Sequence, residues 1–524
     1  MSSHSAPLRV GVTVDSLLQP RWIARVVAQI VASPACTLAF LAVASARVVP
    51  PVALASRLLR DPSHAAHTLF RALDDRVYAR PGDALDGCDL GAIAGDVAYA
   101  SAEGEAVDVV LRLGRAAPAV SARYGVWSLH VGGRASYDDA AGLYEVLGAS
   151  GPTVTELRAS RWGDGPGRVV ARAVTRTDVR SVRRSRNVVL AKAPALVLRA
   201  LRDLFDGAVT DTVEAPSLPR PSMALEATRP GNGAMARMLV EHGLRYAQER
   251  VDRAFNRSQW SIAWQRADAL VSAEPFHYLA PPKHLIWADP FPLVVAGRRY
   301  IFFEEAGYPG GKGHISVLEL GDDGVAGAVT RVLEEPYHLS YPFLFRHEGE
   351  LYMMPEGSER GGVGVYRARS FPYEWERVTV MLPELHIADA TLRQVGDRWW
   401  LFADVSVDGT LAHSEEFHLF YASSPFGPWT PHRRNPIASD AGRARAAGAL
   451  FEHDGRLYRP AQDSAARYGY AVSFNEVVRL DTEEYCEVDR GHMVPSWEPR
   501  ALATHTFNRD GDLTVIDAIV RRAE

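Results

Sequence analysis

Gly297-Arg-Arg-Tyr-Ile-Phe-Phe-Glu304 combines a glycine-led turn, a short apolar and aromatic strand and an acidic residue. Four similar phrases follow it in the second half of the chain: Gly349-Glu-Leu-Tyr-Met-Met-Pro-Glu356, Gly396-Asp-Arg-Trp-Trp-Leu-Phe-Ala-Asp404, Gly455-Arg-Leu-Tyr-Arg-Pro-Ala-Gln-Asp463 and Gly511-Asp-Leu-Thr-Val-Ile-Asp517. The lead glycines are 52, 47, 59 and 56 residues apart. Repeats of roughly 40–50 residues are typical of propeller blades, because one small sheet buries its faces only when neighbouring sheets pack around a common axis. The five phrases predict an all-β, five-bladed propeller over residues 257–524.

The end of the chain indicates how this ring closes. Only seven residues follow Asp517, too few to complete a four-stranded blade. The segment from Trp260 to Ile286 precedes the first phrase, and its beginning, Gln259-Trp-Ser-Ile-Ala-Trp264, has strand character. We expect this segment to supply the missing strands, because a blade that mixes strands from both ends leaves no open sheet edge.

A second polar signal precedes each lead glycine by about six to eight residues, at the start of the predicted innermost strand. The segments are Trp287-Ala-Asp289, Ser340-Tyr341, Ile387-Ala-Asp389, Ala447-Gly448 and Thr504-His505. Innermost strands line the central channel of a propeller. We therefore expect Asp289, Tyr341, Asp389 and His505 to converge at one mouth of the channel, rather than the repeated acids, of which only Glu356 remains a candidate.

Two carboxylates that face one pocket are what glycosidic chemistry requires, one ionised and one protonated. The candidate catalytic residues are Asp289, Asp389 and Glu356, and the candidate substrate-binding residues are Trp287, Tyr341 and His505. Each has an ordinary structural alternative, since aspartates cap turns and large aromatic side chains on strands usually pack between blades. No metal site is predicted, and this chemistry requires no cofactor.

The first 205 or so residues have a different pattern. The apolar runs Leu8–Asp15 and Cys36–Ala44 flank a stretch with helical spacing, Pro20–Ala32, and further strands are expected at Val107–Leu113 and Gly125–His130. Alternating strands and helices predict an α/β domain with an open parallel sheet. Reactive groups in such sheets gather at the carboxyl ends of the strands, which is where His130 lies.

This region resembles the formyltransferase fold of enzymes that use 10-formyltetrahydrofolate, on the segments Val107–Gly114, Tyr124-Gly-Val-Trp-Ser-Leu-His-Val-Gly132, Leu143–Leu147 and Thr153–Thr155. The resemblance places the family's histidine on His130 and its downstream aspartate on Asp164. The family's asparagine falls on Ser128, whose shorter hydroxyl does not reproduce an amide donor that is worth roughly 3–4 kcal/mol in an oxyanion site. The domain is therefore expected to be inactive or to have a changed function.

Residues 206–256 are predicted to connect the two domains. Two Pro/Gly-rich stretches, 215–222 and 229–233, lack an apolar period and are typical of a linker. Ala234–Phe255 has apolar residues at helical spacing and predicts an amphipathic helix that packs against the propeller or joins the domains.

Composition excludes several classes of protein. With 524 residues, 23% of them charged, and a net charge of −5, the chain has no electrostatic field that would gather nucleic acid. The segment Ile23–Val49 is interrupted by Arg25, Pro34 and Arg47, so no integral membrane segment is expected. The three cysteines show no metal-ligand spacing, and the start of the chain lacks the apolar run of a signal peptide. We expect a cytoplasmic protein.

The second half also resembles a family, on the phrases Trp287-Ala-Asp-Pro-Phe-Pro292, Tyr341–Phe343, Met354–Glu356, Asp389–Leu392 and Leu419-Phe-Tyr-Ala-Ser-Ser-Pro-Phe-Gly-Pro-Trp429. It is similar to the propeller domain of plant glucosamine inositolphosphorylceramide transferases and of many bacterial polysaccharide-cluster proteins, and in turn to arabinanase- and fructosidase-type glycosidases. The glycosidase pattern implies Asp289 as the base, Asp389 as a residue that tunes the acid, and a glutamate acid for which Glu356 is the best match.

Three functions are compatible with these patterns. The first is a carbohydrate-active enzyme of glycan or glycoconjugate biosynthesis that acts on a glycosidic bond at the propeller mouth. The second is a folate-dependent N-formyltransferase that acts on an amino sugar through His130. The third is a sugar-binding scaffold without catalytic activity.

Overall fold

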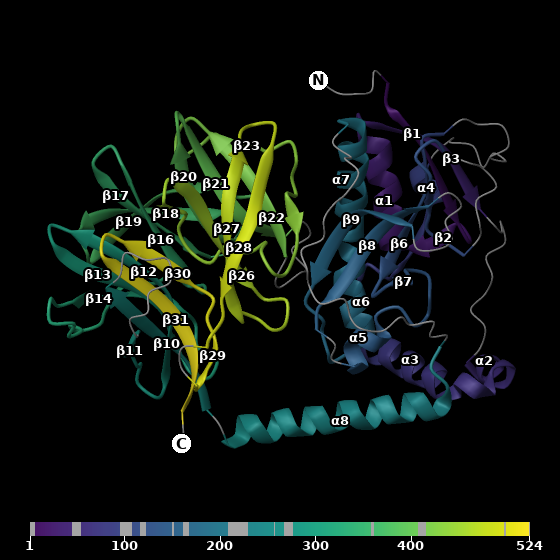
Figure 1. The fold of residues 1–524 in the computed structure, drawn as a ribbon, viewed down its shortest axis with the longest axis horizontal. Helices are drawn as coiled ribbons and strands as arrows, with labels where there is room; N and C mark the ends of the chain where they lie inside the picture. The colour runs from purple at the N-terminus through teal and green to yellow at the C-terminus, as the bar shows by residue number, and fades with distance from the viewer. Residues whose placement is uncertain are drawn as a thin grey trace. The chain divides into compact units, whose positions relative to one another are not determined.

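A computed structural model of the 524-residue chain forms two compact units, residues 1–248 and 249–524. The structure describes residues 6–43, 54–94, 107–115, 122–148, 151–160, 167–207, 229–255, 257–266, 276–357, 361–406, 415–496 and 499–522. Figure 1 shows a mixed α/β arrangement in the first unit and a ring of small sheets in the second. The second unit is a five-bladed all-β propeller, as the repeats predict.

The first unit is built on a seven-stranded sheet with the strand order β3-β1-β5-β6-β8-β9, and β7 pairs with β6. Its strands are β1 (Leu8–Val14), β3 (Cys36–Val43), β5 (Val109–Arg112), β6 (Val126–Val131), β7 (Arg134–Ala135), β8 (Thr153–Ser160) and β9 (Arg168–Thr175). The pairs among β3, β1, β5 and β6 are parallel, whereas β8 pairs antiparallel with both β6 and β9. The predicted parallel sheet is therefore a mixed sheet, because hairpin connections return the chain after β6.

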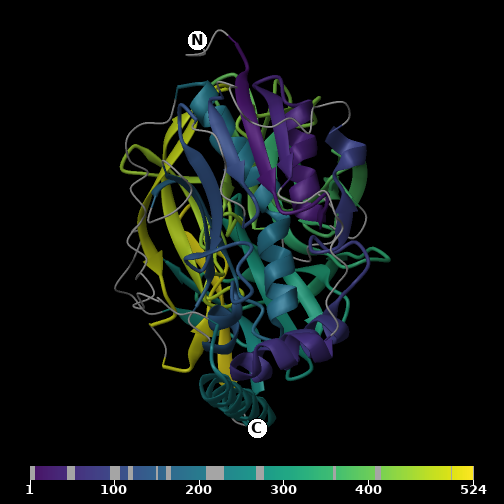
Figure 2. The ribbon, with the colours of Figure 1, turned by 90° about the vertical axis from the view of Figure 1, so that its right-hand side faces the viewer.

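Helices α1 (Arg21–Ala32) and α7 (Ala193–Phe205) pack on this sheet through one apolar cluster that includes Val27, Leu129 and Leu201 (Figure 2). The remaining elements of the unit are β2 (Leu18–Pro20), α2 (Leu54–Arg60), a 3₁₀ turn (Pro62–His64), α3 (Ala65–Tyr78), β4 (Gly87–Asp89), α4 (Gly91–Ala94), α5 (Leu143–Gly148) and α6 (Val182–Ala191). The predicted connecting helix is α8 (Asn232–Phe255). Its Met235 is buried in a cluster with α5 and α6, while Leu244 and Val251 are exposed.

Four blades of the propeller are consecutive antiparallel sheets. Blade 1 contains β12 (Leu285–Val295), β13 (Arg298–Gly307), β14 (His314–Leu320) and β15 (Thr330–Leu333), and blade 2 contains β16 (Ser340–His347), β17 (Glu350–Glu356), β18 (Val363–Ser370) and β19 (Glu374–Met381). Blade 3 contains β20 (His386–Val395), β21 (Arg398–Ser406), β22 (Glu416–Ala422), β23 (Thr430–Pro431) and β24 (Ala438–Ser439). Blade 4 contains β25 (Phe451–His453), β26 (Arg456–Asp463), β27 (Ala471–Leu480) and β28 (Tyr485–Met493).

Blade 5 joins the two ends of the propeller chain. It combines β10 (Arg257–Arg266) and β11 (His277–Leu279) with β29 (Ala501–Ala503), β30 (Phe507–Asp510) and β31 (Leu513–Arg522). Strand β10 pairs with β31 over ten residue pairs, from Arg257 opposite Arg522 to Arg266 opposite Leu513, and the two strands lie side by side in Figure 1. The predicted closure by strands from both ends is confirmed.

The first strand of each blade is interrupted at the position that the sequence marks as polar. The strand register shifts between Ala288 and Phe291 in β12, between Ser340 and Phe343 in β16, and between Ala388 and Thr391 in β20. Blade 5 has its break between β29 and β30, and blade 4 has it between an isolated bridge at Ala446 and strand β25. In blades 1, 2 and 3 the repeat therefore includes a bulge, which changes the direction of one side chain in each of these blades.

Among the described residues, no helix is long and apolar enough to cross a membrane.

Removal of residues 511–524 deletes β31 and leaves β10 with one unpaired edge. We expect this truncation to abolish the cooperative urea-induced unfolding of the propeller, because blades without a closed ring expose apolar faces and strand edges. Near-ultraviolet circular dichroism during urea titration measures this. Removal of residues 523–524 alone, which follow β31, should leave the transition unchanged. A truncated protein that unfolds at the wild-type urea midpoint would show that closure is unnecessary.

Candidate active site

Three of the five break residues share one unusual backbone conformation. Asp289, Tyr341 and Asp389 have φ values of 49°, 45° and 49°, a left-handed region that costs a non-glycine residue roughly 1–2 kcal/mol. All three side chains are buried. Gly448 takes this place in blade 4, where a Cβ would lie 2.1 Å from the carbonyl oxygen of Phe507. Blades 1, 2 and 3 thus share this backbone conformation at the strand break, whereas blade 4 contributes no side chain at this position.

Asp289 is held by residues of blade 5. Its Oδ1 accepts a 2.8 Å hydrogen bond from the hydroxyl of Thr506, and its backbone N–H donates to Oδ2 of Asp517 at 3.1 Å. Burial raises the pKa of Asp289, and the charges of Asp389 and Asp517 raise it further, while His505 opposes them. The carboxylate of blade 1 is therefore positioned by the strands that close the ring.

His505 lies between two carboxylates. Its Nδ1 is 2.6 Å from Oδ2 of Asp517 and 3.8 Å from Oδ1 of Asp289, and its ring stacks on Trp260 at a centroid distance of 4.1 Å. Burial disfavours the charged ring, but the two carboxylates outweigh burial and raise the pKa of His505 to about 9. Burial also disfavours charge on Asp517, yet His505 outweighs it and lowers that pKa. At neutral pH an imidazolium compensates the aspartates.

Asp389 and Glu356 share one guanidinium. Arg445 donates through Nε to Asp389, and its second nitrogen lies 3.3 Å from Asp389 Oδ1 and 3.1 Å from Glu356 Oε2. The side-chain amide of Gln462 also donates to Asp389 at 2.9 Å. Burial raises the pKa of Asp389 to about 7 even though Arg445 opposes the shift. The structure brings these two predicted residues together around an arginine that the sequence analysis did not identify.

Glu304 is a further carboxyl group of this cluster, and the sequence analysis set it aside with the other phrase-borne acids. It pairs with Ala288, immediately before the break at Asp289, and its Oε1 is 3.3 Å from Nε2 of His338. Burial, followed by the charge of Asp289, raises its pKa well above the usual range for a glutamate. Glu304 therefore lies close to Asp289, although Glu356 is the one repeated acid that the sequence analysis retains as a catalytic candidate.

The other three repeated acids are Asp404, Asp463 and Asp517, and of these Asp517 contacts the residues of the cluster described above. Asp517 belongs to the cluster, since it contacts His505 and accepts three backbone N–H groups. Asp404 accepts the backbone N–H of Glu416 within blade 3, and Asp463 contacts His492 at 3.2 Å. Glu304, Glu356 and Asp404 each pair with the residue just before a strand break, so this position by itself does not identify the members of the cluster.

The predicted substrate-binding aromatic residues are core residues. The indole of Trp287 packs against Phe303 and donates to Glu305 at 2.8 Å, in the cluster between blades 5 and 1. Tyr341 is fully buried, and its hydroxyl is 2.8 Å from that of Thr391. Neither ring presents a face on which a sugar can stack, because its neighbours in the core already cover it. Alternate residues of a strand face opposite sides, and this alternation directs the two rings into the core. The register break beside each ring changes the alternation, so the direction of the ring could not be predicted from the sequence.

Asp289, His505 and Asp517 offer ligand atoms that lie within 4.8 Å of one another, a set able to hold a metal ion. Histidine binds a metal through a neutral ring, whereas the raised pKa of His505 favours the protonated form. The imidazolium already supplies the positive charge that these carboxylates need.

The alternative site in the first unit is partly described. The Ser128 hydroxyl and the His130 Nε2 are 2.9 Å apart on β6, and burial, followed by the charge of Arg158, lowers the pKa of His130. The third predicted residue, Asp164, lies outside the described residues. The structure thus pairs a neutral imidazole with a hydroxyl at the end of a parallel strand.

Comparison with known proteins gives matches to the propeller half. Residues 246–504 match the family described as Glucosamine inositolphosphorylceramide transferase 1, N-terminal. Proteins named Glucosamine inositolphosphorylceramide transferase 1 from Oryza sativa subsp. japonica and Arabidopsis thaliana are 38% and 33% identical to the chain over 233 and 232 residues. Each match covers 44% of this chain, and 31% and 30% of the respective relative. The chain thus spans about a third of the length of these relatives.

Two solved structures are similar over about half of the chain. A family 117 glycoside hydrolase of Zobellia galactanivorans has a TM-score of 0.34 and 14% identity, with coverage of 50% of this chain and 90% of its own. A beta-xylosidase/alpha-arabinofuranosidase from a compost microbial metagenome has a TM-score of 0.34 and 12% identity, with coverage of 46% and 92%.

His505→Gln removes the cation between two buried carboxylates. We expect the free energy of unfolding to fall by about 3–5 kcal/mol, because an uncompensated buried charge remains. The histidine's pKa rises from 6.5 in the unfolded chain to about 9 in the fold. Its stabilisation is therefore complete below about pH 6.5 and declines as pH rises through about 9.

Urea unfolding of both proteins at about pH 6 and about pH 10 measures this difference, which should shrink at the higher pH. His492→Gln is the matched control, since this half-exposed histidine also contacts two aspartates. Solvent screens that pair, so the control should lose less than about 1 kcal/mol. Equal losses in the two variants would contradict the role of His505.

Proposed function

We propose that the protein is a carbohydrate-active enzyme of glycan or glycoconjugate biosynthesis that acts on a glycosidic bond at the mouth of the propeller channel. The observation that carries this proposal is the placement of Asp289 and Asp389 at equivalent strand breaks, among further carboxyl groups and two cations. The plant relatives are named for a glucosamine inositolphosphorylceramide transferase, which supports a sugar-containing conjugate as the substrate class.

Asp289 is proposed as the ionised group. Glycosidic chemistry needs one carboxylate that acts as base or nucleophile while another remains protonated. The hydroxyl of Thr506 and the imidazolium of His505 both stabilise negative charge on Asp289, and their contacts are 2.8 Å and 3.8 Å. Burial raises the pKa of Asp289, and these two partners oppose that shift. We therefore assign Asp289 the role of accepting a proton from water or of stabilising positive charge on a sugar ring.

Glu304 and Asp389 are the groups whose environments favour the protonated form. The pKa of Glu304 lies well above its usual range, because burial and the neighbouring charge of Asp289 both disfavour ionisation. Burial holds the pKa of Asp389 at about 7. Glu356, the acid implied by the glycosidase resemblance, lies 3.1 Å from a nitrogen of Arg445. We therefore propose Glu304 as the proton donor, with Asp389, Glu356 and Arg445 as the groups that set the local charge.

Asp289→Asn keeps the side-chain shape and removes the charge. We expect turnover of a glycan or glycoconjugate to fall by at least about 100-fold, because an amide cannot act as base or nucleophile. The fold should persist, since Asn still accepts the hydrogen bond of Thr506. Product formation by chromatography and thermal unfolding measure the two properties.

Asp397→Asn, in the turn between β20 and β21, is the control for loss of one carboxylate outside the cluster. Full activity of the Asp289→Asn protein would overturn glycosidic chemistry at this site. Glycan binding without any product, in wild type and variant alike, would instead support the sugar-binding scaffold.

Formyl transfer to an amino sugar is the second candidate, with 10-formyltetrahydrofolate as the donor. The lowered pKa of His130 is the observation that favours it, since a neutral imidazole can accept a proton from an attacking amine. In this proposal the first unit binds the folate. A cytoplasmic location, where this folate would be available, remains a prediction from the sequence.

Calorimetry with a folate analogue tests this candidate. If formyl transfer is correct, the wild-type chain binds the analogue and His130→Gln reduces formyl transfer by at least about 100-fold without a comparable loss of analogue binding. Lack of binding at millimolar analogue would leave the reaction without a donor. His67→Gln is the control, since this buried histidine belongs to α3 rather than to the sheet.

A further inference from the structure

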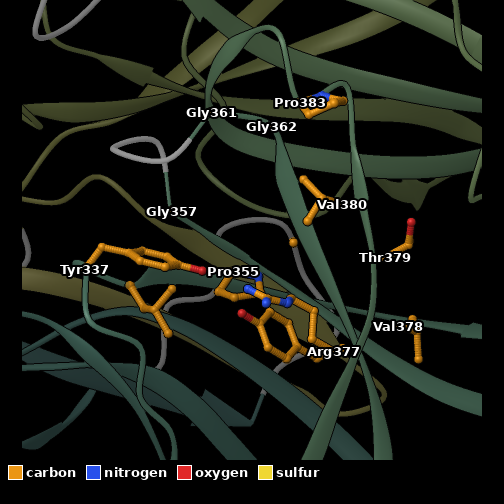
Figure 3. A pocket seen from close by; sticks show the side chains of 13 residues that line it. Tyr337, Pro355, Gly357, Gly361, Gly362, Arg377, Val378, Thr379, Val380 and Pro383 are labelled. Carbon is orange, nitrogen blue, oxygen red and sulfur yellow. The ribbon is translucent and has the colours of Figure 1, made fainter.

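A hollow of the propeller lies on the other side of β17 from Glu356. Figure 3 shows the ring of Tyr337 and the guanidinium of Arg377 pointing toward each other near Pro355, with Gly361 and Gly362 at the opposite end. Its volume of about 480 Å3 falls within the roughly 300–1,000 Å3 of small-molecule sites. The lining comes from blade 2 and from the segment that leads into it from blade 1.

One strand separates this hollow from the candidate active site. Pro355 and Gly357 line the hollow, whereas Glu356 between them contacts Arg445 in the carboxyl cluster. Successive residues of a strand face opposite sides, so the end of β17 forms a wall that the two sites share. A ligand with several linked units could therefore contact both.

The shape of the hollow depends on glycine. A Cβ at Gly357 would lie 2.8 Å from the ring of Tyr337, so only glycine lets this ring approach the backbone. Gly361 and Gly362 have φ values of 76° and 69°, and a Cβ on either would lie within 3 Å of a backbone carbonyl oxygen. These residues keep the backbone close on two sides of the hollow, where larger residues would fill it.

The charges around the hollow cancel. Arg377 lies 3.7 Å from Glu335, and the hydroxyl of Tyr366 donates to the same carboxylate at 2.7 Å. A guanidinium with a carboxylate and tyrosine hydroxyls offers both donors and acceptors without net charge. The apolar lining, which includes Leu339 and Pro355, suits the C–H face of a ring. Such a mixture fits an uncharged, hydroxyl-rich ligand and disfavours a phosphate.

We propose that this hollow is a glycan-binding subsite that holds an uncharged sugar unit of the chain whose glycosidic bond lies at the channel mouth. This proposal rests on the proposed carbohydrate function. The ring of Tyr337 contacts the C–H face of the sugar, and Arg377 with Glu335 binds its hydroxyl groups. Tyr337 and Arg377 line the hollow rather than the carboxyl cluster. They would therefore determine which sugar is bound without taking part in the reaction.

A glycan array that contains neutral, uronic-acid and phosphorylated oligosaccharides tests the full-length protein. We expect a neutral oligosaccharide as the best ligand. Its Kd, measured by calorimetry, should rise at least tenfold in Tyr337→Ala and in Arg377→Met, while Tyr337→Phe retains most of the affinity. Arg298→Met is the matched control, since Arg298 also pairs with a glutamate but lies outside the lining.

Hydrogen exchange on the wild-type protein gives a test that requires no variant, and the bound oligosaccharide should protect residues 355–357 and 377–383. Preference for anionic glycans, absence of glycan binding at millimolar concentration, or unchanged affinity in Arg377→Met would overturn the subsite. An Asp289→Asn protein that keeps full turnover, together with binding that depends on Arg377, would overturn the proposed reaction and leave the subsite intact.

Discussion

The antiparallel pairing of β10 with β31 is the constraint on which the propeller and its candidate site depend. It joins strands about 250 residues apart and removes the open edge that a ring of four blades and a fragment would leave. The same pairing sets β29, β30 and β31 beside blade 1, where Asp517 accepts the backbone N–H of Asp289. The strand that closes the ring therefore also positions part of the carboxyl cluster.

Charge balance then decides what the cluster can do. Five carboxyl groups, Asp289, Glu304, Glu356, Asp389 and Asp517, surround two cations, Arg445 and His505. Burial raises the pKa of a carboxyl group and a neighbouring cation lowers it, so the balance differs from group to group: it raises the pKa of Asp389 despite Arg445 and lowers that of Asp517 beside His505. The pKa of Asp517 beside His505 is lowered, so this carboxyl group favours the ionised form. The pKa of Glu304 is strongly raised, so this group favours the protonated form.

Much of this arrangement was predictable from the repeat. The five phrases predicted the blades, and the polar residues ahead of each glycine predicted where the innermost strands break. Glu304 was not predicted because the residues ahead of each glycine, rather than the repeated acids, were expected to face the channel. Arg445 was not predicted because it lies on an irregular segment between β24 and β25. Trp287 and Tyr341 were predicted to bind sugar, but a register shift beside each one turns the ring into the core.

The amino-acid sequence by itself determined the number of blades, the closure by both chain ends and the alternation of strands and helices in the first unit, because these follow from local periodicity and from the length of chain available. Only the tertiary structure decided which acids meet, which of them share a cation, and that the first sheet is mixed. The physical reason is that burial and charge pairing depend on distances between residues that are remote in the chain, and no local pattern contains those distances.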